Sequence, residues 1–148
     1  MKHSKLMKER IRRTRVLFRE LGFDVVEGER SEDTFTAAYE NDEGFLGGFF
    51  IDSENKFLEV AFTFSFSPEL EAYLQQRLAE MISICYEFGC YLNVQNGESE
   101  LEFSIYSKIY YAGLNYYALK ETLRDFQACV ESIKSLVDLQ NESTEEST

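Results

Sequence analysis

The sequence is poor in the residues on which most enzymatic and metal chemistry depends. It contains one histidine, His3, one proline, no tryptophan and three cysteines, Cys85, Cys90 and Cys129. A single histidine excludes nearly all histidine-based catalysis and most zinc sites. An odd number of cysteines is not typical of a disulfide framework, so a reducing cytoplasm is the simpler context. The single proline argues against a polyproline or linker-rich architecture.

Segments that direct a chain into a membrane are not found. The first twenty residues are charged throughout and lack the apolar core of a signal peptide. No run approaches the roughly 18 to 20 apolar residues that a membrane span needs. The richest apolar stretch, residues 60–66, is interrupted by Thr63 and Ser65. We therefore expect a cytoplasmic protein that does not bind a membrane.

The spacings that carry catalytic or metal chemistry are also missing. Cys85 and Cys90 lack the C-x-x-C spacing of a metal pair, and Gly47-Gly48 is not followed by the Lys-Ser/Thr of a phosphate-binding loop. The carboxylates occur mainly in turns, which is typical of solvated loops, and they do not follow the calcium-loop pattern. We predict that the protein is not an enzyme and has no cofactor and no metal. Whether Cys90 is a reactive thiol stays open, whereas Cys85 and Cys129 fall on apolar helical patterns and should act as small hydrophobic side chains.

Charge is abundant and unevenly distributed. The chain of 148 residues has a net charge of −12, with 27 acidic and 15 basic side chains. Residues 1–21 carry eight basic and two acidic side chains, a net +6, and the remainder carries −18. A surface this acidic repels phosphates, so we expect no nucleic-acid partner. The pattern indicates a basic first helix on or near an acidic body.

Hydrophobic periodicity predicts three helices and five strands. Steps of three and four residues indicate helices up to Gly22, from Ser67-Pro68 to about Phe88, and from about Asn115 to Leu139. Alternation of apolar and polar residues indicates strands near 34–40, 45–52, 57–66, 92–95 and 101–110. The expected buried positions of the helices are Met7, Ile11, Thr14, Phe18 and Leu21, then Leu70, Leu74, Leu78, Met81, Ile82 and Cys85, then Leu119, Leu123, Phe126, Val130, Ile133 and Val137.

These elements predict an α+β fold, in which helices pack on an antiparallel five-stranded sheet in the order α-β-β-β-α-β-β-α. The length suits one domain, residues 1–140. Residues 141–148 are rich in Ser, Thr and Glu, so we expect a disordered acidic tail.

Three glycine-containing segments carry specific backbone expectations. Asn41-Asp42-Glu43-Gly44 has hairpin-turn chemistry with a glycine for the left-handed position. Asn96-Gly97 predicts a type I′ turn. Gly47-Gly48 predicts a bulge or the close approach of another backbone. From Phe57 to Phe66 the alternation predicts one face of the strand buried by large aromatic side chains.

Two groups of residues are candidates for partner binding. The first is a stripe of cations on the predicted first helix, which we call the basic stripe: Lys5, Lys8, Arg12, Arg15 and Arg19. The stripe suits anionic partners, but we favour a solvated face, or one that neutralises the acidic body of the same chain or of a dimer partner. The second group is tyrosines near the last strand, because tyrosine combines a large apolar ring with a polar tip at interfaces: Tyr106, Tyr110, Tyr111 and Tyr116. Ordinary packing under the last helix is the alternative for these.

The order of elements and several short segments resemble a known family. The chain is similar to class I type III secretion chaperones and to the YbjN-like proteins that share their fold. The segments that carry the resemblance are Leu21-Gly22-Phe23, Ser67-Pro68-Glu69-Leu70, Glu87-Phe88-Gly89-Cys90-Tyr91-Leu92, Asn96-Gly97-Glu98 and Ala112-Gly113-Leu114, followed by Leu119, Leu123 and Phe126. The asparagine-rich middle-helix motif of YbjN-like proteins is absent, because residues 73–78 read Tyr-Leu-Gln-Gln-Arg-Leu.

The resemblance implies a non-enzymatic, acidic homodimer that holds an extended segment of another protein. The charge is compatible with that role, since an acidic body attracts basic segments at long range. Exposed sheet edges could accept a strand. The alternative is a regulatory or structural homodimer of the YbjN-like kind, without a secretion client.

Overall fold

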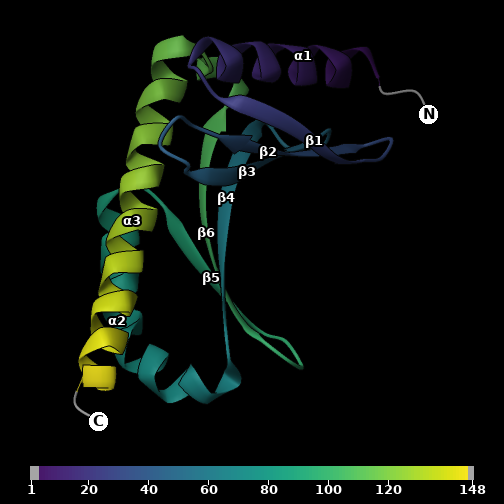
Figure 1. The fold of residues 1–148 in the computed structure, drawn as a ribbon. Coiled ribbons are helices and arrows are strands. Elements are labelled where there is room, and N and C mark those ends of the chain that lie inside the picture. Colours follow the sequence, from purple (N-terminus) through teal and green to yellow (C-terminus); the bar gives the residue numbers. More distant parts are fainter. Residues whose placement is uncertain (1–3, 147–148) are drawn as a thin grey trace. The chain divides into compact units, whose positions relative to one another are not determined.

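The computed structural model describes residues 4–146, with side chains described through residue 138 (Figure 1). Two short 3-10 turns, Pro68–Leu70 and Tyr111–Gly113, accompany the regular elements. The helices and strands are α1 (Lys5–Glu20), β1 (Asp24–Arg30), β2 (Thr34–Glu40), β3 (Leu46–Asp52), β4 (Phe57–Phe66), α2 (Glu71–Glu87), β5 (Tyr91–Asn96), β6 (Leu101–Tyr110) and α3 (Tyr116–Glu146).

The predicted α+β class is confirmed, but the predicted number of strands is wrong. The sheet has six strands in the order β1-β2-β3-β4-β6-β5, and the additional strand is β1. Its sequence, Asp-Val-Val-Glu-Gly-Glu-Arg, is exposed at nearly every position. Hydrophobic alternation arises only where one face of a strand is buried, so a two-sided exposed edge strand has no such signal. Strands β1 and β2, β2 and β3, β3 and β4, and β5 and β6 pair in antiparallel fashion.

The chain forms two compact units. The boundaries between the units along the chain fall within β4, β6 and α3. Unit 1 comprises the described residues of Met1–Ala61 with Ser107–Leu123, and unit 2 those of Phe62–Tyr106 with Arg124–Thr148. The expectation of one domain at 1–140 stays a prediction. The predicted disordered tail also stays one: the helical backbone of α3 is assigned to Glu146, and the side chains beyond residue 138 lie outside the described part. Within the described residues, no helix is long and apolar enough to cross a membrane.

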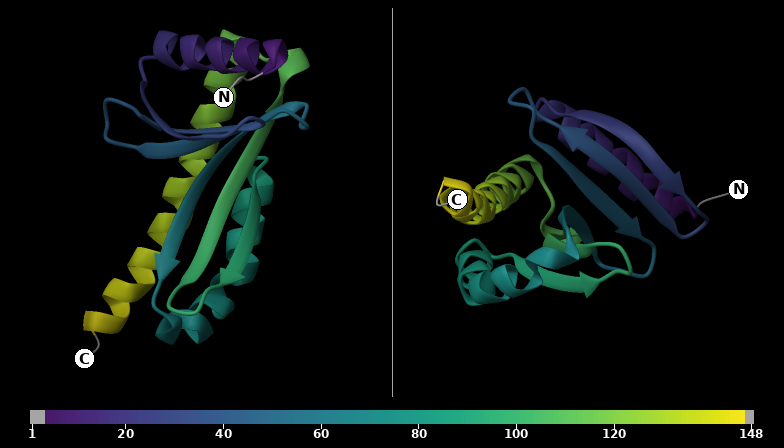
Figure 2. Two further views of the ribbon diagram at one scale, coloured as in Figure 1. Left: turned by 90° about the vertical axis from the view of Figure 1, so that its right-hand side faces the viewer. Right: turned by 60° about the horizontal axis from the view of Figure 1, so that its bottom comes forward.

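In unit 1, the apolar face of α1 packs against the strands β1–β3 (Figures 1 and 2). Most of the predicted stripe is confirmed, because Met7, Ile11, Thr14 and Phe18 are buried, while Leu21 is half-buried. The Phe18 ring stacks on Phe49 with centroids 4.7 Å apart and lies 4.9 Å from the Tyr39 ring. Burying an aromatic side chain of this size stabilises a domain by up to about 3 kcal/mol, and favourable ring pairs add about 1 kcal/mol.

In unit 2, α2 and the part of α3 beyond Leu123 contact each other directly. The Tyr73 hydroxyl donates to the Val137 carbonyl at 2.9 Å, and the thiols of Cys85 and Cys129 meet at 3.8 Å. The predicted buried positions of α3 are confirmed along the whole stripe. For α2 the prediction holds only in part, because Leu74, Met81 and Cys85 are buried, Leu70 and Leu78 are half-buried, and Ile82 is 52% exposed.

The predicted aromatic burial along β4 holds only for its first half. Leu58 and Val60 are buried, whereas Phe62, Phe64 and Phe66 are half-buried. The three phenylalanines instead contact one another and Phe103, with Phe62 and Phe64 4.9 Å apart and Phe66 and Phe103 5.8 Å apart. The far half of β4 therefore carries a row of aromatic rings that remains partly accessible.

Two turns test the glycine expectations. The turn between β2 and β3 is as predicted: Gly44 has φ +85°, and Asn41 Oδ1 accepts from the backbone N–H groups of Glu43 and Phe45. The type I′ prediction at Asn96-Gly97 is wrong, since among the described residues only Gly22, Gly44 and Gly89 have positive φ. Asn96 instead pairs with Leu101, and the Gly97 N–H donates to the Glu100 carbonyl. Four loop residues close this hairpin, so neither central residue needs the left-handed region.

The Gly47-Gly48 pair was predicted to form a bulge or to be approached closely by another backbone, and both predictions are wrong. Gly47 instead leaves room for the side chain of Tyr39. The register between β2 and β3 is regular here, with Tyr39 opposite Gly47. A Cβ at Gly47 would lie 2.6 Å from Cζ and Oη of Tyr39, whereas a Cβ at Gly48 would meet only ordinary contacts, the nearest at 3.5 Å. The buried Tyr39 hydroxyl has no hydrogen-bond partner among the described residues, and burial raises the pKa of this phenol. Gly47 thus lets a bulky ring lie flat across the neighbouring strand.

We expect Gly47→Ala to lower the free energy of unfolding by about 1–3 kcal/mol, because the new methyl group overlaps the Tyr39 ring. Gly48→Ala is the matched control, since a methyl group fits there, and it should change stability by less than about 1 kcal/mol. Urea denaturation of the two variants measures both values. Equal stability of the two variants would contradict this account of Gly47.

Candidate functional site

Helix α1 is well delimited, and its rotation sets the positions of its cations. The Ser4 hydroxyl accepts a hydrogen bond from the Met7 N–H at 3.1 Å, which is N-cap geometry. Gly22, with φ +90°, ends the helix. One face of α1 is buried by Phe18 and its neighbours. The cations of the basic stripe are three or four residues apart, so they lie in a row along the adjoining face of the helix.

Two arginines of α1 are used internally by unit 1. The Arg10 Nη1 donates to the carbonyl oxygens of Asn55 at 3.0 Å and Ser53 at 3.4 Å, and its guanidinium lies 4.3 Å from the centroid of the Tyr111 ring. Arg13 donates to the Leu114 carbonyl. Because a guanidinium presents several donors in one plane, each arginine can satisfy backbone carbonyls that the sheet and helices leave free. Sequence periodicity did not single out these two residues.

The basic stripe is directed to solvent. Lys5, Lys8, Arg12 and Arg19 are exposed and Arg15 is half-buried. Arg12 pairs with Glu9 on the same helix at 2.8 Å. Between residues 4 and 138, no carboxylate lies within 4 Å of the other four cations of the stripe. Within residues 4–138, the expected neutralisation by the chain's own acidic residues is therefore made through an ion pair at Arg12 alone.

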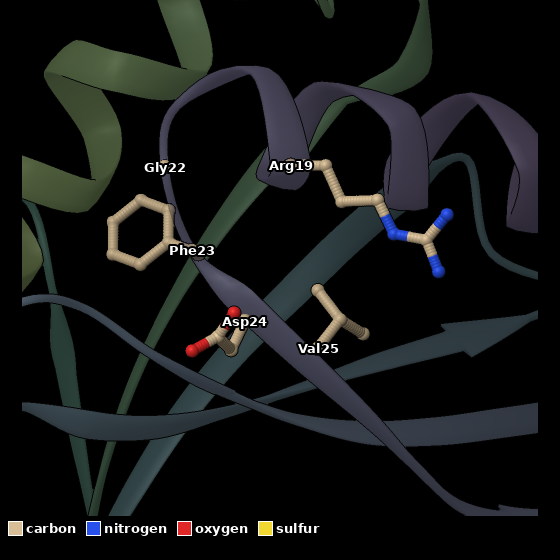
Figure 3. A pocket seen from close by; sticks show the side chains of 5 residues that line it. All are labelled: Arg19, Gly22, Phe23, Asp24 and Val25. Atoms are coloured by element: carbon tan, nitrogen blue, oxygen red, sulfur yellow. The ribbon is translucent and has the colours of Figure 1, made fainter.

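A shallow hollow of about 450 Å³ lies at the end of α1, where the basic stripe stops. It is lined by Arg19, Gly22, Phe23, Asp24 and Val25 (Figure 3). The Arg19 side chain extends from the last turn of α1, and Asp24 and Val25 begin the edge strand β1. The hollow thus combines one cation, one carboxylate and apolar groups.

The predicted tyrosines are divided between the two units. Tyr106 lies in unit 2, opposite Tyr91 across the β5–β6 pair, whereas Tyr110, Tyr111 and Tyr116 lie in unit 1. Tyr110 is 53% exposed and packs edge-on against Phe57, with their centroids 5.9 Å apart. The Tyr116 ring meets the exposed ring of Tyr117 at 5.3 Å. A role for any of them in partner binding stays a prediction.

Tyr111 has a structural environment. Its backbone N–H donates to the Lys56 carbonyl, its ring lies against Arg10, and its hydroxyl is buried without a hydrogen-bond partner among the described residues. Burial raises the pKa of Tyr111 to about 12, while the Arg10 charge opposes that shift and the Asp52 charge adds to it. Tyr111 therefore holds α1 against its unit more than it presents a surface.

The two edge strands of the sheet differ in the devices that prevent unwanted pairing. Strand β1 carries Asp24, Glu27, Glu29 and Arg30, and its register shifts between Glu27 and Arg30. Charges and irregular register are common protections of an edge. Strand β5, Tyr-Leu-Asn-Val-Gln-Asn, has no charge, proline or glycine, and its six residues pair regularly with β6. The β5 edge is thus unprotected, a feature the sequence shows once the strand is known to lie at an edge.

Exposed apolar side chains lie on the elements that flank the β5 edge. Helix α2 contacts β5 and presents Ile82 and Tyr86 one turn apart, the latter 87% exposed. On β5 itself, Tyr91 and Val94 are also exposed. Unit 2 therefore combines an edge strand of the sheet with exposed apolar side chains, which is the combination that binds extended polypeptide.

The three cysteines are buried in unit 2, as free thiols. Cys129 donates to the Cys85 sulfur, and this interaction lowers the pKa of Cys85 and, together with Cys90 and burial, raises that of Cys129. Cys90 donates to the Phe88 carbonyl at 3.6 Å. In the described residues, no group of three potential metal-ligating side chains has the geometry to hold an ion.

Glu59 lies on strand β4 and is half-buried. Burial raises its pKa, and the Lys108 charge lowers it. The Lys108 ammonium also lies 4.9 Å from the centroid of the Phe57 ring, so it interacts both with the Glu59 carboxylate and with this ring.

Comparison with known proteins supports the fold alone. No family model matches the chain. No curated protein matches it either. A crystal structure of an uncharacterized protein from Methanothermobacter thermautotrophicus is similar, with a TM-score of 0.71 and 14% sequence identity. The similarity covers 87% of this chain and 96% of that chain. The α+β architecture is therefore shared with a solved structure.

We expect replacement of Arg10 to destabilise the protein more than replacement of Arg12. Arg10→Ala removes hydrogen bonds to two carbonyl oxygens and a cation–ring contact, for a loss of about 1–3 kcal/mol. Arg12→Ala removes one exposed ion pair and should cost at most about 1 kcal/mol. Thermal unfolding of both variants provides the comparison, and an Arg12 variant as unstable as the Arg10 variant would contradict it.

Alkaline pH should weaken the fold through Tyr111. An unfolded tyrosine loses its proton near pH 10, whereas the pKa of folded Tyr111 is raised to about 12. The folded state therefore binds this proton more tightly, so the associated stability is complete below pH 10 and disappears as the pH rises toward 12. Denaturant midpoints measured across this range should fall less steeply in Tyr111→Phe than in the wild type. Identical pH dependence of the two proteins would refute this assignment.

Proposed function

We propose that this protein is a non-enzymatic protein-binding module that forms a homodimer and holds an extended segment of a partner protein, in the manner of class I type III secretion chaperones. The observation that carries the proposal is the unprotected edge of β5. This strand offers a straight run of backbone donors and acceptors without a charge to repel a pairing strand. An extended polypeptide gains main-chain hydrogen bonds there by strand addition.

The surroundings of β5 support binding through side chains as well. Tyr91 and Val94 are exposed on the strand, and Ile82 and Tyr86 are exposed on the neighbouring helix α2. Apolar and aromatic groups beside a free edge provide contacts for alternate side chains of an added strand, which gives specificity beyond the backbone bonds.

A second copy of the chain is the partner implied by the dimer. Two chains of net charge −12 repel one another at long range, and β5 is an uncharged strand at which they can meet. Antiparallel pairing of β5 with its own copy follows a two-fold axis, as expected for a closed homodimer. If the second copy occupies this edge, the extended client segment lies on another surface; if not, the client pairs with β5 itself.

The alternative function is a YbjN-like regulatory or structural homodimer without a secretion client. The same edge then serves only for self-association. The two functions differ in whether a second polypeptide is bound in addition to the dimer partner, and not in the role of β5.

We expect Val94→Lys to abolish pairing at the β5 edge, because a cation on an edge strand opposes the addition of another strand. Val26→Lys on β1 is the matched control, as Val26 is also an exposed valine of an edge strand. Light scattering after size-exclusion chromatography should give a dimer for the wild type and for Val26→Lys, and a monomer for Val94→Lys.

A second substitution separates loss of pairing from loss of folding. Asn93→Lys places a charge on the same edge at an exposed polar position, with less effect on packing. Circular dichroism should be unchanged in all three variants. A dimer that persists in both β5 variants, with folded structure intact, would exclude β5 as the pairing edge.

A further inference from the structure

We propose that the basic stripe of α1 and the hollow at its end form a binding surface for an acidic polypeptide segment that carries an apolar side chain at one end. This surface lies entirely in unit 1 and involves neither β5 nor the rest of unit 2. It deepens the proposed protein-binding function, because it states the chemistry of a bound segment.

The free state of the cations is the first argument. Arg10 and Arg13 show that α1 uses arginine internally where carbonyl oxygens need donors. The cations of the basic stripe make no such bonds, and only Arg12 has a carboxylate partner between residues 4 and 138. Holding several like charges side by side is unfavourable unless counter-charges are supplied. An anionic ligand supplies them.

The spacing of the stripe indicates a short ligand. Steps of three and four residues place successive cations about 5 Å apart along the axis, and Lys5 to Arg19 spans about 21 Å. The surroundings are acidic, since β1 and the turn after it carry Asp24, Glu27, Glu29, Glu32 and Asp33. At physiological salt, charges act over about 8 Å, so a ligand confined to the stripe is attracted, whereas a long polyanion that runs past it is repelled.

The hollow favours polypeptide over nucleic acid. Val25 lies below the Arg19 side chain and provides an apolar contact for a side chain of a bound segment, whereas the Phe23 ring points to the other side and packs against Phe18 and Tyr39 (Figure 3). Asp24 also lines the hollow, and its carboxylate repels any anionic group, so the part of the ligand that enters the hollow must be uncharged, as an apolar side chain is and a phosphate is not. The exposed side chain of Val16 on α1 adds a further apolar contact. A segment of acidic residues that ends in a leucine or similar residue satisfies both parts of the surface.

The test is a titration of the full chain with a fluorescein-labelled oligoglutamate peptide that ends in leucine, followed by fluorescence anisotropy at low salt. We expect saturable binding that weakens at physiological salt by about ten-fold. The peptide that ends in serine should bind more weakly, because it leaves the hollow empty. An oligoglutamine peptide and a single-stranded oligothymidylate of equal charge are the other ligands to compare.

The variant Lys8→Glu, Arg12→Glu, Arg19→Glu should lower the affinity for the peptide by about ten-fold or more. The matched control is Lys120→Glu, Arg124→Glu, Lys134→Glu on α3, which produces the same net charge and should retain most of the affinity. If the α1 triple variant does not fold, the affinity is measured on Lys8→Gln, Arg12→Gln, Arg19→Gln, which changes the charge of α1 less.

Several outcomes would overturn the proposal. They are undiminished affinity in the folded α1 variants, an equal loss in the α3 control, equal binding of the peptides ending in leucine and serine, and binding of the oligothymidylate as tight as that of the peptide. Val94→Lys should bind the peptide like the wild type. If the experiments on β5 show no pairing at that strand but the peptide still binds, only the proposal for the β5 edge is refuted. If β5 pairs as expected but the peptide does not bind, only the proposal for the basic stripe is refuted.

Discussion

The packing of Phe18 against Phe49 and Tyr39 is the contact on which the arrangement of unit 1 depends. It sets the rotation of α1 about its axis, because the face that contains Phe18 must be buried. Once that face is set, Arg10 and Arg13 reach carbonyl oxygens of unit 1, and the basic stripe points to solvent. Gly47 belongs to the same arrangement, since it leaves space for the Tyr39 ring.

The surfaces of the two units offer different chemistry to a partner. Unit 1 presents the basic stripe, in which only Arg12 has a carboxylate partner among residues 4–138, and an acidic, irregular edge strand, β1. Unit 2 presents an uncharged, regular edge strand, β5, with exposed apolar side chains on that strand and on α2. Protection of one edge and not of the other is the pattern expected when one edge has a partner and the other must remain free of one.

Much of the architecture was predictable from periodicity. The stripe of α3 from Leu119 to Val137 is buried as expected, because a helix with one buried face needs apolar residues at steps of three and four. The errors share a cause. Strand β1 lacks alternation because neither of its faces is buried, and the role of Gly47 depends on a residue of the neighbouring strand. Such features depend on contacts between segments, which local patterns do not contain.

The sequence by itself determined the α+β class, the positions of most helices and strands, and the segregation of positive charge onto α1, since these follow from local periodicity and composition. Only the tertiary structure decided which strands lie at the edges, which arginines of α1 donate to carbonyl oxygens of the chain, and which cations have no such partner among residues 4–138. Those properties arise from the pairing of distant strands and the burial of one helix face. An arginine in the same local pattern could either donate to a carbonyl oxygen of the chain or point to solvent, and a strand with the same pattern could lie at an edge or in the centre of the sheet.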